Sequence, residues 1–146
     1  MRQFLLGSCL LLLLGVSFVA RAAEPADVEA ADEAAIRHVI EAQLAAFRRD
    51  DGVAAFSFAS PQIQAIFKDP AHFMAMVRGG YAAVYRPQEV EFQDLTELRG
   101  QPTQPVLLVG PDNQVVIAYY FMEKQPGGDW RIDGCTLGPA PDQSAI

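Results

Sequence analysis

The sequence predicts an α+β domain in which helices come first and an antiparallel sheet follows. In the first half of the chain, apolar residues recur at three- and four-residue spacing, as they do on one face of a helix. In the second half, valine-rich runs are separated by short turns that contain glycine and proline. Runs so close together can pair only as antiparallel hairpins. We therefore expect the helices to pack on a sheet made by the second half.

A long first helix is predicted over residues 27–49. Ile36, Ile40, Leu44 and Phe47 form one apolar stripe along it. Acidic residues near its start and arginines at its end both suit the helix dipole. This stripe is the predicted helical half of the core.

Shorter helices follow the long one. The first is expected over residues 53–59, and two more start at Ser60 and Asp69, each an N-cap residue followed by proline. The last of them stops at the glycines of residues 79–80. The helical half of the domain therefore ends shortly after residue 80.

Strands are expected at residues 89–98, 106–109, 115–122 and 130–137. In a regular strand, Val90 and Phe92 would point to one face and Leu95 to the other. A bulge near Gln93 or Asp94 is therefore expected, because it would bring all three to the same face. The strand at 115–122 has apolar residues on both of its faces, so both faces must be covered by other parts of the protein or by a partner. One face packs on the helices, and the other meets a second layer, a curved part of the sheet or a partner subunit, which suggests a homodimer through the sheet.

The only tryptophan lies at the start of the last strand. Trp130 shares strand parity with Ile132, so we expect both to point into the core against the helical stripe.

Residues 1–22 have the pattern of a cleaved secretory signal. Arg2 precedes an apolar run, and Ala20-Arg21-Ala22 gives the small residues that signal peptidase requires. The alternative is an anchor that stays in the membrane, but the apolar run is at the short end for crossing a bilayer. We expect an exported protein, periplasmic or secreted, with no stable membrane insertion after cleavage. A single domain is expected at residues 23–138 and a flexible tail at 139–146.

The chain is acidic. Its net charge is −7, and the signal carries two arginines and no acid, so the remainder has 9 basic and 18 acidic residues. Nucleic-acid binding depends on Lys and Arg neutralising phosphates, and anionic membranes attract the same residues. Both kinds of partner are therefore not expected.

Metal and cofactor sites are not expected either. Cys9 leaves with the signal, which makes Cys135 the lone cysteine, expected to be a buried and inert thiol. With His38 and His72 as the only histidines and no HExxH spacing, a zinc site is disfavoured. No glycine-rich phosphate loop and no nucleophile motif are present.

Tyrosines are the best remaining candidates for a site. Tyr81 and Tyr85 lie four residues apart, next to Arg86. Tyr119 and Tyr120 point to opposite faces of their strand, so one of them faces the interior between helices and sheet. Tyr81, Tyr85 and Tyr120 are the candidate binding residues, although a tyrosine at such a position is more often only part of the core.

Several segments resemble the bacterial family called domain of unknown function 4864, within the nuclear-transport-factor-2-like superfamily. They are VIEAQLAAF at 39–47, DD at 50–51, MVRGGY at 76–81, VYRP at 84–87 and WRIDGC at 130–135. The resemblance implies a cone of curved sheet wrapped by helices. Cones of this superfamily often bind small apolar molecules, and some are isomerases or dehydratases.

Such enzymes pair a buried acid or histidine with a tyrosine donor, because proton abstraction beside a carbonyl needs a base and an oxyanion stabiliser. The resemblance makes Asp133 with Tyr119 or Tyr120, or His72 with Tyr81, the candidate pairs. Three functions follow. The leading one is a non-enzymatic module that binds a small apolar ligand or a protein; the others are an isomerase or dehydratase and a self-associating structural domain.

Overall fold

The computed structural model describes residues 25–141. The predicted signal and its cleavage site lie outside the described residues, as does most of the predicted tail. Among the described residues, no helix is both long enough and apolar enough to cross a membrane.

Helices occupy the first half of the described chain. They are α1 (Pro25–Arg48), α2 (Gly52–Ser57), α3 (Pro61–Phe67), α4 (Pro70–Gly80) and α5 (Ala82–Tyr85). The long helix is confirmed, and it starts two residues before the predicted residue 27. Pro25 is its first residue, a position where the missing N–H costs no hydrogen bond. The four-residue helix α5 was not predicted, because four residues are too few to show the spacing of apolar residues that is typical of a helix.

The predicted N-caps are confirmed for α3 and α4. Ser60 Oγ accepts a hydrogen bond from the Ile63 amide at 3.2 Å, and Asp69 Oδ1 accepts one from the His72 amide at 2.9 Å. These bonds satisfy amides that a helix start leaves without a partner. The serine–proline and aspartate–proline pairs therefore fix where the two helices begin.

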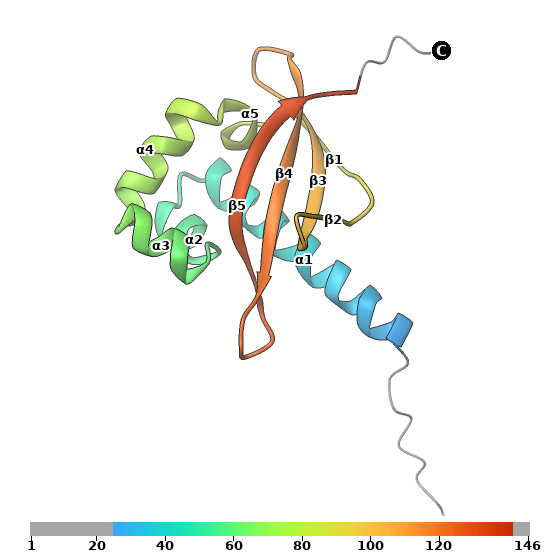
Figure 1. The fold of residues 1–146 in the computed structure, drawn as a ribbon. Coiled ribbons are helices and arrows are strands. Elements are labelled where there is room, and N and C mark those ends of the chain that lie inside the picture. The colour runs from blue at the N-terminus through green and yellow to red at the C-terminus, as the bar shows by residue number, and fades with distance from the viewer. Residues whose placement is uncertain (1–24, 142–146) are drawn as a thin grey trace, which may run out of the picture.

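The second half forms one antiparallel sheet, as predicted. Its strands are β1 (Glu89–Phe92), β2 (Thr96–Leu98), β3 (Gln101–Val109), β4 (Val115–Lys124) and β5 (Trp130–Pro139). The order is β1-β3-β4-β5, and β2 also pairs with β3. In Figure 1, α1 runs diagonally behind the sheet and α2 to α5 gather at one side of β5. The fold is α+β.

The predicted bulge separates β1 from β2. Phe92 is opposite Val106 and Thr96 is opposite Thr103, so four steps along one strand match three steps along β3. The strand predicted at 106–109 begins earlier, at Gln101, and contains Pro105. A proline has no amide to donate to a neighbouring strand. Pro105 is tolerated because it lies opposite this irregularity, where its carbonyl accepts from the Gln93 amide at 3.0 Å.

The core lies between α1 and one face of the sheet, which we call the inner face. Ile36, Ile40, Leu44 and Phe47 are each at most 1% exposed, as the stripe predicted. The inner face contributes buried residues from three strands, namely Val106, Leu108, Ala118, Tyr120, Met122, Trp130 and Ile132. The predicted inward positions of Trp130 and Ile132 are confirmed.

Trp130 also has a polar partner. Its indole Nε1 donates to Asp32 Oδ1 of α1 at 3.1 Å, and Lys124 Nζ donates to the same oxygen at 2.8 Å. The pKa of Asp32 is lowered, first by the hydrogen bond from Lys124 and then by the one from Trp130. This three-residue contact joins α1 to the end of the β4–β5 hairpin.

The opposite face of the sheet, the outer face, carries Ile117, Tyr119 and Phe121 of β4. Ile117 is 6% exposed and the two aromatic residues are half-buried. A side chain added at Gly138 would come within 3.2 Å of the Tyr119 ring, and one added at Gly134 within 3.5 Å of the Phe121 ring. The two rings therefore lie against glycines of β5, and the three β4 residues on this face are apolar or aromatic.

A short segment between α2 and α3 covers part of the free edge of β5. The Ile132 amide donates to the Phe58 carbonyl at 2.9 Å, and the Ser60 amide donates to the Ile132 carbonyl at 2.8 Å. Ala59 forms a parallel bridge with Ile132. The start of α3 is thereby fastened to the sheet.

Candidate functional site

A cavity of about 400 Å³ lies between the inner face of the sheet and helices α3 and α4. Its size is within the range of small-molecule sites. The lining comes from the second half of α1, from α3, α4 and α5, and from β4 and β5. The residues are Gln43, Phe47, Ala59, Ile63, Ile66, Phe67, Phe73, Met76, Val77, Tyr81, Val84, Tyr120, Ile132, Gly134 and Cys135.

Helix α3 covers this cavity with little support. None of its residues is buried, and Ile66 is 60% exposed although it lines the cavity. Ile63 and Phe67 are half-buried. A seven-residue helix that buries no side chain gains little stability from packing. Gln64 Nε2 donates to the Phe56 and Ala59 carbonyls at 3.2 and 3.1 Å, and the Phe67 ring packs edge-on against Phe73 at 5.6 Å. The helix is therefore held by polar and partly buried contacts, whereas its neighbour α4 buries three side chains.

The lining is almost wholly apolar, and no lining residue carries a charged side chain. Two of its polar groups are already satisfied within the protein. Gln43 Nε2 donates to the Ala55 carbonyl at 3.1 Å, and the Tyr81 hydroxyl donates to the Cys135 carbonyl at 3.0 Å. The cavity thus has no charge with which to bind a ligand.

Tyr120 is the exception among the lining polar groups. It is 1% exposed, and its hydroxyl has no hydrogen-bond partner among the described residues. Burial raises the pKa of Tyr120 well above its ordinary value, so the hydroxyl remains a neutral donor. Gln104 lies directly opposite on β3 with its Oε1 also unpartnered, but it does not line the cavity. A buried polar group without a partner is costly, and sites of function are where such groups are retained.

Cys135 is a free thiol in the cavity wall. The residue as a whole is half-buried, whereas its thiol group is desolvated. Burial raises the pKa of its thiol to about 12, so the reactive thiolate is scarce at neutral pH. Nucleophilic chemistry at this residue is disfavoured.

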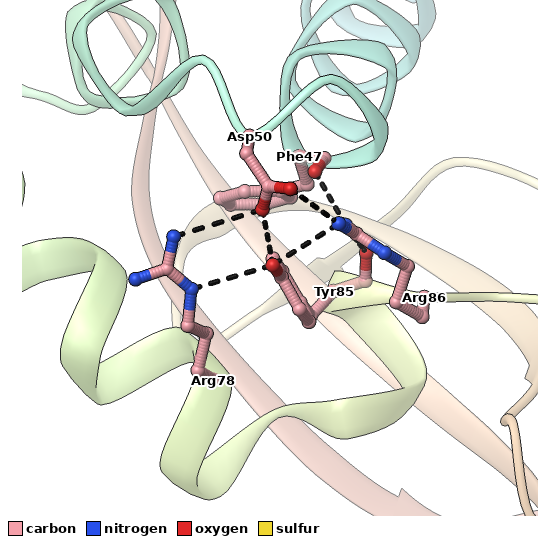
Figure 2. A network of polar contacts seen from close by, with 5 residues as sticks. All are labelled: Phe47, Asp50, Arg78, Tyr85 and Arg86. Carbon is pink, nitrogen blue, oxygen red and sulfur yellow. Dashed lines mark hydrogen bonds and ion pairs between the residues drawn. The ribbon is translucent and has the colours of Figure 1, made fainter.

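A polar network closes the end of α1, beside the cavity (Figure 2). The Tyr85 hydroxyl donates to Asp50, whose other oxygen accepts from Arg86 at 2.9 Å. Arg86 also donates to the Phe47 carbonyl near the C-terminus of α1, which accepts the Asp50 amide as well at 3.0 Å. Arg78 Nε donates to the Tyr85 hydroxyl at 3.3 Å. The pKa of Asp50 is lowered, first by the Tyr85 hydrogen bond and then by Arg86.

Tyr85 belongs to this network. Its ring lies 3.8 Å below the Arg86 guanidinium and edge-on to Phe47 at 6.5 Å, so it does not line the cavity. The residue instead holds α5 against the end of α1. The sequence missed this because Asp50 is separated from it by more than thirty positions and only the fold brings the two together.

The candidate catalytic pairs are not assembled. His72 is 74% exposed and pairs with Asp69 at 2.7 Å, while Tyr81 bonds to Cys135. Asp133 accepts from Ser60 Oγ at 2.7 Å and from Gln101 Nε2 at 3.0 Å, and it bonds to no tyrosine.

Tyr119 lies on the outer face, away from the cavity, as the alternation of the strand requires. Tyr81 and Tyr120 are thus the two tyrosines brought together at the cavity. In the described part of the chain, no group of three or more His, Cys, Asp or Glu could hold a metal ion.

Comparison with known proteins gives the class of this domain. The chain matches the family described as Domain of unknown function (DUF4864) over residues 29–145. The protein belongs to this family. No curated protein and no solved structure matches it.

Proposed function

We propose that this protein binds a small apolar molecule in the cavity beneath α3. The proposal is carried by one observation, a cavity of about 400 Å³ with an apolar lining and a lightly held cover. Burying apolar ligand surface there gives roughly 25 cal/mol per Å² before the costs of association. The same ligand would bury more of Ile66, which is 60% exposed in the free protein.

We also propose that the domain belongs to the nuclear-transport-factor-2-like superfamily and that the protein is exported. The first is supported by the order of helices and curved sheet, with the cavity at their junction. The second is supported by residues 1–22 of the sequence alone. If export is correct, N-terminal sequencing of the mature protein starts at Ala23; a mature membrane-bound form that retains Met1 would refute it.

A cavity-filling variant tests the binding proposal. N-phenyl-1-naphthylamine, an uncharged dye that brightens in apolar surroundings, is titrated into the purified protein. Cys135→Phe places a ring in the cavity and should abolish the fluorescence increase. Thr136→Phe is the matched control, since its exposed side chain is on the outer face. Equal dye binding by parent and Cys135→Phe, or none by the parent, would contradict the proposal.

Self-association through the outer face is a second candidate, favoured by the apolar row of Ile117, Tyr119 and Phe121. Two sheets can pack face to face about 10 Å apart through such rows. Size-exclusion chromatography with light scattering should then give a dimer for the parent and a monomer for Phe121→Arg. A parent that stays monomeric at millimolar concentration removes this candidate.

A further inference from the structure

The chemistry of the lining restricts the ligand further. Because the cavity offers no charged side chain, a carboxylate or ammonium group placed inside it would lose its hydration without gaining a counter-ion. An ionised ligand is therefore excluded from the interior more strongly than a neutral molecule of equal length.

Among the residues that line the cavity, Tyr120 carries the one hydroxyl group without a hydrogen-bond partner. Gln43 and Tyr81 already donate to backbone carbonyls, while the Tyr120 hydroxyl donates to nothing. This hydroxyl is closed to solvent in the structure, so bulk water does not supply the missing partner. A ligand with one acceptor oxygen would satisfy it, provided that the wall shifts slightly to admit that oxygen.

We propose that the ligand is an uncharged apolar molecule with one hydrogen-bond acceptor, such as a ketone, ester or ether oxygen, and that this acceptor binds the Tyr120 hydroxyl. The inference rests on the proposed function, since it names the ligand class of the same cavity. Opening of the loosely supported helix α3 gives the ligand its way in and lets the surrounding side chains adjust.

The test is competition between two ligands of matched length. The dye is displaced with 2-dodecanone, which is neutral and carries one acceptor, and with dodecanoate, which is ionised at neutral pH. We expect the ketone to bind at least about tenfold more tightly. Tyr120→Phe should weaken the ketone about 3- to 10-fold, as expected for one net hydrogen bond. Tyr119→Phe is the control, because it removes the same group from the outer face.

The stability of the ligand-free variant gives an independent readout. If the Tyr120 hydroxyl has no partner, removing it relieves a buried polar group, and Tyr120→Phe melts at the same temperature as the parent or higher. A lower melting temperature means that the hydroxyl is satisfied inside the protein, for example through Gln104, and overturns the inference.

The outcomes of the competition separate the two proposals. Dodecanoate binding as tightly as the ketone, or an unchanged ketone affinity in Tyr120→Phe, overturns this inference and leaves apolar binding in place. If neither the dye nor either competitor binds the parent, the proposed function itself fails.

Discussion

Replacing Trp130 tests the core most directly. The side chain is 8% exposed and belongs to the cluster formed by the α1 stripe and the inner face. Truncating a buried tryptophan to alanine costs about 3–5 kcal/mol. The whole free energy of unfolding of a small domain is roughly 5–15 kcal/mol. Trp130→Ala should therefore lose a large part of the stability of this domain.

Trp130→Phe separates packing from hydrogen bonding. Phenylalanine keeps most of the apolar contact but cannot donate to Asp32, so we expect a loss of about 1–2 kcal/mol, within the ordinary range for point substitutions. Combining it with Asp32→Asn in a double-mutant cycle isolates the contribution of the contact between the two side chains.

The assay is urea unfolding followed by far-ultraviolet circular dichroism, which needs no tryptophan. Val53→Ala, at a residue 72% exposed on α2, is the control and should change the stability by less than about 0.5 kcal/mol. Emission from the parent should be that of a buried indole. A loss below about 1 kcal/mol in Trp130→Ala, together with red-shifted emission from the parent, would refute the core assignment.

Three further predictions concern the helical cover and the carboxylates. Ser60→Ala removes both the cap of α3 and the donor to Asp133 and should cost about 1–3 kcal/mol, measured by urea unfolding, with Ser60→Thr losing less. An unchanged stability in Ser60→Ala would mean that neither bond matters. In hydrogen exchange, the amides of residues 62–67 should exchange faster than those of α1, and they should slow when the dye binds. Slow exchange without ligand would contradict a weakly held α3. Asp32 and Asp50 have pKa values lowered by hydrogen bonds, so their contributions are present above the unfolded pKa of about 3.9 and are lost as pH falls through the folded pKa. The urea midpoint should thus fall below about pH 4, and less steeply in the double variant with asparagine at both positions.

Much of the fold could be predicted because local signals and burial agree. The spacing of the α1 stripe, the two cap–proline pairs and the turns near residues 110 and 127 all specify the elements that form. The early start of β3 was missed because Pro102 and Pro105 argue against a strand when read alone. Only the pairing with β1, β2 and β4 shows that both prolines are accommodated.

The site was predicted only in part. Alternation along β4 predicted that one of Tyr119 and Tyr120 faces inward, and the structure places Tyr120 there. The role of α3 was missed, although Ile63, Ile66 and Phe67 are apolar on a helix too short to bury all three. The contact of Asp133 with Ser60 was not predicted, because the two residues lie 73 positions apart in sequence and no local pattern predicts such a contact.

The hydrogen bonds between the 58–60 segment and β5 have a consequence for assembly. An exposed strand edge offers free amides and carbonyls to another chain, and sheets grow into aggregates through such edges. Phe58 and Ser60 occupy these groups of Ile132, and the far edge is interrupted by the bulge after Phe92.

Phe58 and Ser60, which cover the β5 edge, thus come directly before α3, the helix that covers the cavity. A movement of α3 that began before Ser60 would expose the β5 edge each time a ligand entered. A movement that pivots at Pro61 leaves both hydrogen bonds to Ile132 intact. If ligands enter as proposed, the hydrogen bonds of the buried Ser60 would limit how far α3 opens, and losing them should expose the β5 edge to pairing with another chain.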